Sequence, residues 1–479
     1  MTQTFAIDVI QTLHSDEANE FRLFLESPYF MQGFKQEGVR PLFEALYLAV
    51  QNGTIETLEK EDLHEQLFPG REYVESKLDK LMSELKRLLE RFVLVQRYLS
   101  DDNEAQQLLD ISVDMRLRGL ETRYQQALEK TKKKADHAGG ESLKSLFFRY
   151  RLAMEEQEWH STFNKGKGDL NIPETINHLD VYYFAHRLWM QNHLLFMQRA
   201  ASIPITLEQI VDIPQKALQS SHFLDISRDV HVLLNKDALH ENDFNQILHK
   251  IQSHEQSLSP ESLAEFYAYL RNLCVILIDA GHTHIHAVLH EINKDNLRRG
   301  YFYLHGKISP NACLSMMQTA LSVNDIPWAS EFIEVHKDNI LGENETQDFY
   351  RMNKALCLFG EKKYEEALEM IPFGSTYSFY HLMARRLELK IHYELRSELL
   401  DHKIDAFKMF ISRAGRKVFS ANLHELFTNF VNFVRQLSQS DGPQARQRSQ
   451  TLLKRISEKE RVAERLWLLE KARELGGKR

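Results

Sequence analysis

Glycine, proline and cysteine are scarce in this sequence of 479 residues, which contains 19 Gly, 11 Pro and 3 Cys. Average usage would be about 7% Gly and about 5% Pro. Both residues mark the turns between strands, so their scarcity disfavours β-sandwiches and barrels. It favours long helices with short connections, and the composition therefore predicts an all-α fold.

The three cysteines, Cys274, Cys313 and Cys357, lie far apart and show no Cys-x-x-Cys spacing. A sparse, odd set of this kind is typical of buried, unreactive thiols in a reducing compartment. The longest strongly apolar run, Leu273–Ile278, falls far short of the roughly 20 residues that cross a bilayer. The first residues lack the basic and apolar segments of a secretory signal. We therefore expect a cytoplasmic protein without membrane spans.

Catalytic and cofactor motifs are also missing from the sequence. It contains no GxSxG, no GxxxxGK[ST], no GxGxxG and no HExxH, so nucleophile elbows, phosphate-binding loops and zinc-protease helices are not indicated. Adjacent acids such as Glu155 and Glu156 point about 100° apart on a helix and do not form an acid–base pair. We expect no enzyme activity, no catalytic residues and no cofactor. The alternative is an enzyme whose site is assembled from distant helices.

A heptad-like apolar pattern is the clearest periodic signal near the N-terminus. Steps of three and four connect Val74, Leu78, Leu81, Leu85, Leu88, Phe92, Val95 and Leu99. A second run follows at Leu109, Val113, Leu117, Leu120, Tyr124 and Ala127. Such stripes cover a partner helix. We predict an antiparallel helical hairpin in which the two stripes pack together; dimerisation through 74–99 is the alternative.

Domain boundaries are indicated by stretches without periodic apolar residues. The basic run and paired glycines at Lys130–Glu141 form the first, and Ser438–Gln444 forms the last. We predict an N-terminal helical domain with a long hairpin over 1–140, a helical repeat region over 141–440 and a charged C-terminal helix over 441–479.

One segment, Asn353–Ile371, resembles a tetratricopeptide (TPR) unit. Ala355 and Leu358 lie on its first helix, and Tyr364 and Ala367 open its second; small residues at such positions let two helices approach closely. A looser copy lies 38 residues earlier, with Ile326, Ala329 and Phe332 in matching places and Met317 where a small residue is expected. The resemblance implies an α-solenoid of degenerate TPR-like helical pairs. The segment Glu20–Phe30, which contains Ser-Pro-Tyr-Phe, and several later stretches also resemble a group of bacterial helical-repeat proteins without an assigned activity.

Histidines are the candidate metal ligands. On a helix, His282, His286 and His290 would share one face at four-residue spacing, a feasible metal geometry. No cysteine or carboxylate pair completes a tetrahedral set, so we favour solvated and half-buried imidazoles without a metal. The aromatic segments Asp180–Gln198 and Arg298–Gly306 could line a peptide groove, although such residues more often form an inter-helix core.

Nucleic-acid binding is the alternative to protein binding. A net charge of -8 and a pI of about 6.3 disfavour a general nucleic-acid coat. The segment Asp62–Leu89 is similar to a helix-turn-helix, but its lysines are balanced by acids. The tail over 441–479 holds eleven Lys or Arg against six Asp or Glu. The predicted function is a non-catalytic scaffold that holds another protein or peptide in a solenoid groove. The alternative is a nucleic-acid-associated regulator that uses 62–89 or the basic C-terminal helix.

Overall fold

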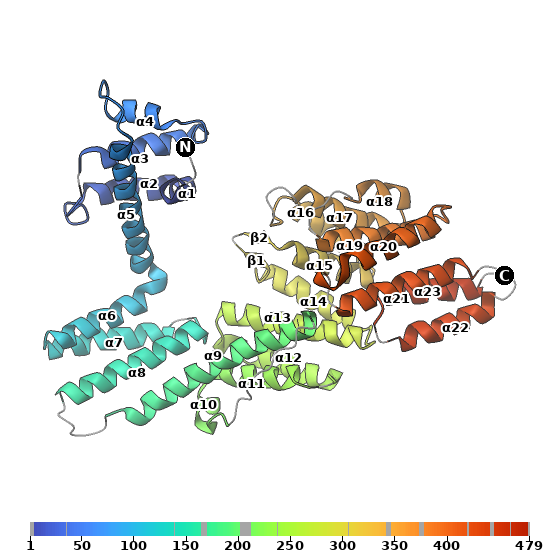
Figure 1. Ribbon diagram of the computed structural model, residues 1–479. Coiled ribbons are helices and arrows are strands. Elements are labelled where there is room, and N and C mark those ends of the chain that lie inside the picture. The colour runs from blue at the N-terminus through green and yellow to red at the C-terminus, as the bar shows by residue number, and fades with distance from the viewer. Residues whose placement is uncertain are drawn as a thin grey trace. The chain divides into compact units, whose positions relative to one another are not determined.

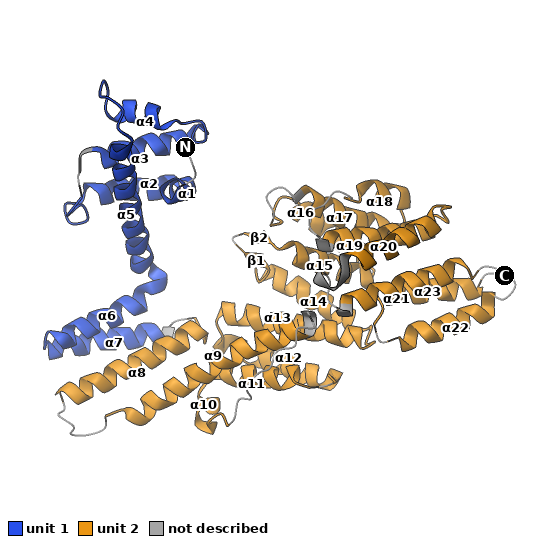
Figure 2. Ribbon diagram, viewed as in Figure 1, with its two compact units in different colours: residues 1–137 blue, residues 138–479 orange. Residues whose placement is uncertain are grey.

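The computed structural model describes residues 4–34, 36–137, 139–163, 170–201, 212–236, 238–304, 306–341, 346–372, 378–418, 421–440, 445–459 and 461–477 (Figure 1). It divides into two compact units, Met1–His137 and Ala138–Arg479 (Figure 2). Apart from a two-stranded sheet, the regular structure in these ranges is helical. The prediction of an all-α fold is confirmed.

The described residues of unit 1 form seven α-helices and a short 3-10 turn, η1: α1 (Phe5–Thr12), α2 (Ser15–Glu26), α3 (Gln36–Gln51), α4 (Lys60–Leu67), α5 (Glu75–Leu99), η1 (Asp101–Asn103), α6 (Glu104–Leu117) and α7 (Glu121–His137). The long helix α5 buries the centre of its heptad stripe, from Leu78 to Phe92, against α1 to α4. Phe21 of α2 lies between the rings of Phe43 and Phe92, with ring centroids 4.8 and 5.1 Å away. An aromatic core therefore joins α2 and α3 to α5.

The prediction that the apolar stripe of α5 packs against the second apolar run, from Leu109 to Ala127, was wrong. Helix α6 packs mainly against α7 and touches α5 only around the turn that connects them. Gly119, with φ 72°, ends α6 and splits the second apolar run between two helices. Leu117 and Leu120 beside this turn are 73% and 46% exposed. The α5 stripe is covered by the short N-terminal helices instead, because their aromatic side chains already fill its groove.

In the part of unit 2 that the structure describes there are sixteen α-helices and a short 3-10 turn, η2: α8 (Leu143–Phe163), α9 (Ile172–Ala201), α10 (Gln215–Ser220), α11 (His222–Leu234), α12 (Glu241–Ser253), η2 (Glu255–Ser257), α13 (Pro260–Asp279), α14 (Ile285–Arg298), α15 (Pro310–Ser322), α16 (Ile326–His336), α17 (Thr346–Gly360), α18 (Tyr364–Met370), α19 (Ser378–Glu394), α20 (Leu400–Val418), α21 (Ala421–Ser438), α22 (Ala445–Glu458) and α23 (Arg465–Gly477). Between α14 and α15, strands β1 (Tyr303–Leu304) and β2 (Lys307–Ile308) pair antiparallel. The single charged helix predicted over 441–479 is instead two helices, α22 and α23, which pack on each other.

Helix starts in unit 2 follow a recurring local pattern in which a capping side chain precedes a proline. The hydroxyls of Ser259 and Ser309 accept hydrogen bonds from the backbone N–H of Ser262 and Ala312, each at 3.2 Å. A proline follows each serine at the first helical position, where its missing N–H costs nothing. These serine–proline pairs therefore fix where α13 and α15 begin.

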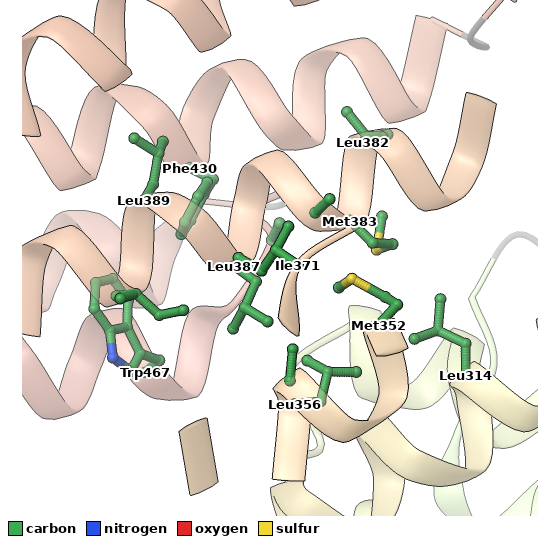
Figure 3. Packing of buried hydrophobic residues seen from close by; sticks show 14 of the residues in the cluster. Leu314, Met352, Leu356, Ile371, Leu382, Met383, Leu387, Leu389, Phe430 and Trp467 are labelled. Atoms are coloured by element: carbon green, nitrogen blue, oxygen red, sulfur yellow. The ribbon is translucent and has the colours of Figure 1, made fainter. Parts of the chain in front are cut away.

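Helices from α15 onward alternate between two roles. Each of α15, α17, α19 and α21 contacts the odd-numbered helix that follows it, and α16, α18, α20 and α22 each pack against a sequence neighbour. The side chains between them form one continuous apolar cluster, in which Leu314, Met352, Met383 and Trp467 come from four different helices (Figure 3). The predicted pair Asn353–Ile371 is the hairpin of α17 and α18, with Ala355 and Ala367 fully buried.

The turns that close successive hairpins share one backbone conformation. Asn324, Lys362 and Arg396 have φ of 61°, 63° and 49°. The N–H of the residue after each donates to a carbonyl five residues back, at 2.9 to 3.0 Å. This is the Schellman ending of a helix, in which glycine usually occupies the left-handed position. Here non-glycine residues occupy it, which is why the repeat of this turn is hard to see in the sequence.

Replacing Lys362 with glycine is expected to stabilise unit 2 by about 0.5–1 kcal/mol, because glycine adopts the left-handed conformation without the steric cost that lysine carries there. The Lys362 side chain is exposed, so little else is lost. Thermal unfolding followed by tryptophan fluorescence would report the change, since Trp159, Trp189, Trp328 and Trp467 all lie in unit 2. Lys362→Ala keeps the strained backbone and should show no gain; an equal gain in both variants would contradict the argument.

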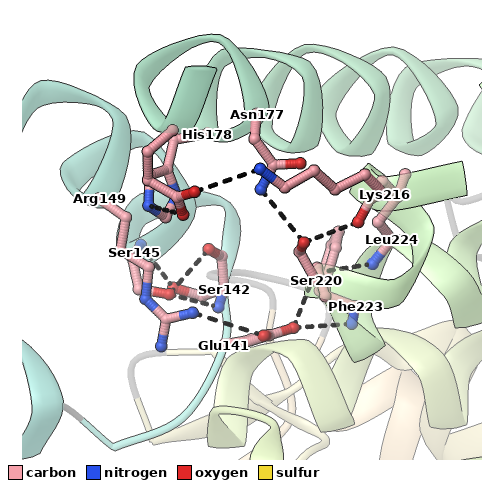
Figure 4. Close-up of polar contacts among 12 residues, drawn as sticks. Glu141, Ser142, Ser145, Arg149, Asn177, His178, Lys216, Ser220, Phe223 and Leu224 are labelled. Atoms are coloured by element: carbon pink, nitrogen blue, oxygen red, sulfur yellow. Dashed lines mark hydrogen bonds and ion pairs between the residues drawn. The ribbon is translucent and has the colours of Figure 1, made fainter. Parts of the chain in front are cut away.

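Unit 2 begins with a polar connection rather than an apolar one. The backbone of Glu141 pairs with the segment before α13: its N–H donates to the Ser257 carbonyl at 2.8 Å, and its carbonyl accepts from the Ser259 N–H at 3.0 Å. Its buried carboxylate accepts hydrogen bonds from the Ser221 hydroxyl at 2.8 Å and the Phe223 N–H at 2.9 Å, at the start of α11 (Figure 4). A negative charge is favourable at a helix N-terminus. Glu141 therefore joins α8, α11 and α13.

Candidate docking surface on helix α9

Helix α9 has two apolar faces. It starts beside Pro173, a residue suited to the first turn of a helix, and runs without a glycine to Ala201. Its inner face packs against α8, α10 and α11. The side chains that this face buries are Asn177, Val181, Ala185, Leu188, Gln191, Asn192 and Leu195. The Asn192 amide donates to the Ser227 carbonyl of α11 at 2.9 Å, so the inner face is fixed by both packing and hydrogen bonds.

The outer face of α9 carries a row of exposed apolar side chains, which we call the α9 surface. Its members are Ile172, Ile176, Leu179, Tyr183, Met190, Leu194 and Met197, with exposed fractions of 38% to 52%. Their spacing of three, four or seven residues places them on one line along the helix. At 100° per residue this line lies opposite the buried face. The α9 surface therefore extends from Ile172 to Met197, a distance of about 38 Å at 1.5 Å per residue.

An apolar line of this length needs an explanation. Single exposed apolar side chains are normal, but a contiguous apolar patch usually marks an interaction site. A helix that is apolar on all sides is normally buried on all sides. In α9 the described neighbours cover one side only. The α9 surface is the largest ordered array of exposed apolar side chains on any one helix of the described chain.

Polar groups border the middle of the α9 surface. The Arg187 guanidinium donates to the Tyr183 hydroxyl at 2.7 Å, and the Tyr182 hydroxyl lies 3.1 Å from Nδ1 of His186. His186 and Arg187 lie one helical turn after Tyr183, in the seven-residue gap of the apolar row between Tyr183 and Met190. A polar break inside an apolar row gives a bound helix a defined register.

The sequence identified this segment but not its two faces. Asp180–Gln198 was expected to form inter-helix core, and its inner half does so. The apolar side chains on its outer face, Tyr183, Met190, Leu194 and Met197, are exposed. Apolar residues on both sides of a helix look alike in the sequence, because periodicity does not tell which side meets the rest of the protein. The second aromatic segment, Arg298–Gly306, lies at the end of α14 and in β1, outside this surface.

The candidate histidines lie close in sequence but have separate surroundings. Helix α14 begins at Ile285, so His282 lies before the helix, and it reaches toward Glu241, 4.0 Å away. Burial lowers the pKa of His286, and the charge of Glu464 opposes that shift. Nε2 of His290 lies 2.9 Å from Asp325. In the described ranges, His, Cys, Asp and Glu form no group of three that could hold a metal ion.

The cysteines are isolated thiols inside the helical core. Cys274, Cys313 and Cys357 are buried and form no disulfide. Burial raises the thiol pKa to about 12 for Cys274 and Cys313 and to about 11 for Cys357. A thiol that stays protonated at neutral pH is a poor nucleophile. These residues therefore act as small apolar side chains.

The helix-turn-helix candidate, 62–89, consists of α4, a turn and the first part of α5. Three cations of this segment have contacts within unit 1. The Lys77 ammonium lies 3.4 Å from the centre of the Phe68 ring, the Lys86 ammonium lies 3.8 Å from Glu90, and the Arg87 guanidinium lies 4.9 Å from the centre of the Phe34 ring. After α5 the chain continues into η1 and α6, so no wing-like strand pair follows among the described residues.

Of the helices described, none is both long enough and apolar enough to pass through a bilayer. Comparison with protein-family models, with curated proteins and with solved structures gives no match to this chain.

Proposed function

We propose that this protein is a non-catalytic α-solenoid that holds an amphipathic helix of a partner protein on the α9 surface. The observation that carries the proposal is the line of seven exposed apolar side chains on α9, opposite the buried face of the same helix. Helix-in-groove recognition uses anchors at this three- and four-residue spacing. The partner is therefore a protein segment with a matching apolar stripe.

The solenoid part of the proposal is supported by how the helices alternate. In TPR-like arrays the first helix of each pair contacts the first helix of the next pair. The contacts from α15 to α17, α19, α21 and α23 follow that order, and the hairpins end in the same left-handed turn at Asn324, Lys362 and Arg396. Helix α9 precedes this stack in the chain and is held by α8, α10 and α11.

The size of the α9 surface fits a specific but modest interface. Seven side chains with about two-fifths to half of their area exposed would bury on the order of 500 Å². A partner helix would bury a similar area, so the total is on the order of 1,000 Å². That is the lower limit for a specific protein interface.

A double substitution in the α9 surface, Leu179→Asp with Met190→Asp, is expected to abolish capture of the partner while leaving the fold intact. Both side chains are exposed, at 42% and 50%, so the melting temperature should change by no more than about 2 °C. The matched control is Val232→Asp with Val335→Asp, two exposed residues of α11 and α16 at 51% and 62%. The measurement is affinity purification from lysate with mass spectrometry, with and without nuclease.

Three results would count against this function. The proposal fails if both double variants capture the same proteins as the unmodified chain, or if every captured protein disappears after nuclease treatment. A second copy of this chain is the other possible occupant of the α9 surface. If light scattering showed a dimer that the Leu179→Asp, Met190→Asp variant converts to a monomer, the surface would be a self-association site.

A further inference from the structure

Positive charge is concentrated at the C-terminal end of the chain. Residues 400–479 contain seventeen Lys or Arg and nine Asp or Glu, whereas the whole chain contains 60 and 68. Several of these cations have structural partners. Arg465 donates to the carbonyls of Ile456 and Ser457 at the end of α22, and the buried Lys471 ammonium lies 3.0 Å from Glu394. These groups are not available to a ligand.

Helix α22 carries a different set of cations. Its inner face buries Ser449, Leu452 and Ile456 against its neighbours. Its outer face exposes Arg446, Gln447, Arg448, Gln450, Thr451, Lys454, Arg455, Ser457 and Glu458. This face therefore has four cations and one acid, and Glu458 lies at its C-terminal end. We call it the α22 surface.

Three of the four cations of the α22 surface have weak or neutral partners among the described residues. Arg448 donates to the Gln439 carbonyl at 3.2 Å, and Arg455 donates to the Gln436 side chain at 2.8 Å. Lys454 lies 3.8 Å from Glu458, at the limit of an ion pair. Among the described carboxylates, the one close to a cation of the α22 surface is thus Glu458, and it lies at the limit of an ion pair.

We propose that the α22 surface binds the phosphate backbone of a double-stranded nucleic acid. Arg446 and Arg455 are nine residues apart, so the cations span about 14 Å along the helix axis, and at 100° per residue they are spread over the half of α22 that faces away from its buried side chains. Gln447, Gln450 and Thr451 lie between them, and amide and hydroxyl groups also donate to phosphate oxygens. The positive end of the α22 dipole lies near Arg446 and adds to the attraction.

A duplex fits this surface better than a single strand or a membrane. Single-strand sites stack bases on exposed aromatic rings, and α22 contains no aromatic residue. Membrane-surface helices insert an apolar face into the lipid, whereas the apolar face of α22 is buried. Binding through the backbone alone is independent of sequence and strongly dependent on salt.

The test is fluorescence anisotropy of the full chain with a labelled 20-base-pair DNA duplex. Four phosphate contacts predict a slope of about -3.6 for the logarithm of the binding constant against that of salt concentration. Affinity should then fall roughly 100-fold between 50 and 200 mM salt. The variant Arg446→Gln, Arg448→Gln, Lys454→Gln, Arg455→Gln should bind at least about 30-fold more weakly at 50 mM salt. Its folding is checked by circular dichroism, and a variant with only the three arginines changed to lysine should bind within about 3-fold of the unmodified chain.

The control removes the same number of positive charges from unit 1: Lys130→Gln, Lys132→Gln, Lys133→Gln, Lys134→Gln on α7. Retained binding in this control supports the assignment to α22. The proposal is overturned if the unmodified chain does not bind the duplex at 50 mM salt, or if both quadruple variants lose affinity equally. Tighter binding to a single strand, or equal displacement by polyglutamate, would also overturn it, the latter in favour of an acidic protein partner.

Discussion

Replacing Gly140 with alanine is expected to destabilise unit 2 by more than about 3 kcal/mol. Gly140 has φ 95°, and a Cβ atom at this position would lie 2.4 to 2.6 Å from the backbone of Leu258 and Ser259. Real Cβ atoms do not come so close to backbone atoms, and the backbone on both sides is held by the hydrogen bonds of Glu141. The segment must therefore separate from the start of α13, and the Glu141 carboxylate would leave its donors at the start of α11. Loss of a buried charged hydrogen-bonding group adds to the cost of strain.

Gly139 provides the matched control. A Cβ atom on Gly140 would approach the backbone of Leu258 and Ser259 too closely, whereas a Cβ atom on Gly139 would meet nothing within 4 Å. Gly139→Ala should therefore change stability by less than about 0.5 kcal/mol. Because the tryptophans all lie in unit 2, fluorescence-monitored unfolding in urea separates its transition from that of unit 1. Similar midpoints for Gly140→Ala and Gly139→Ala would show that the Glu141 segment does not hold this part of the fold.

Local features of the fold could be predicted from the sequence. The scarcity of glycine and proline indicated helices, and the heptad positions from Leu78 to Phe92 are the buried side of α5. The pairing of this stripe could not be predicted. Periodicity states that a helix has an apolar side, but the partner is decided by which side chains fit. The ring of Phe21 lies 5.1 Å from that of Phe92, and nothing in the spacing reveals this contact.

The candidate surfaces and polar networks show the same limit. His282, His286 and His290 have suitable spacing, yet the helix starts after His282, and the His290 side chain contacts Asp325 at the start of α16. The decisive contacts are distant in sequence: Glu141 meets Phe223 across 82 residues. In the sequence, nothing distinguishes Gly140 from the adjacent Gly139. Only the approach of Leu258 distinguishes it from Gly139.

A buried ionic cluster connects the start of α23 to α19. Glu464, with φ 55°, places its carboxylate 3.1 Å from Nε of Arg386 and 2.7 Å from Nζ of Lys390. The Lys390 ammonium also lies 4.5 Å from the centre of the Phe359 ring and 5.6 Å from that of Trp467. Two cations in apolar surroundings thus share one carboxylate. The backbone of Glu464 is left-handed, a conformation that is costly for a residue other than glycine.

The charge state of Glu464 should make the stability of unit 2 depend on pH below 5. Burial alone would raise its pKa from 4.5, but the charges of Arg386 and Lys390 outweigh burial and lower the pKa to about 2. A lowered carboxyl pKa stabilises the fold above the unfolded pKa, and that stability is lost as the pH falls from about 4.5 toward 2. The difference corresponds to about 3 kcal/mol. The melting temperature of the unmodified chain should therefore fall more steeply between pH 5 and 3 than that of Glu464→Gln.

At neutral pH, Glu464→Gln is expected to destabilise unit 2 by about 3–5 kcal/mol, because removing one member of a buried ionic group leaves the other charges without compensation. Burial lowers the pKa of Lys390 and the Glu464 carboxylate opposes that shift, so the variant should also favour neutral Lys390. A triple variant, Arg386→Met, Lys390→Met, Glu464→Met, removes every charge at similar volume and should recover most of the loss. Urea unfolding followed by tryptophan fluorescence compares the three proteins. If the triple variant were as unstable as Glu464→Gln, the loss would come from packing around Trp467 and not from unpaired charge. If Glu464→Gln were as stable as the unmodified chain, water would already solvate the charges of Arg386 and Lys390.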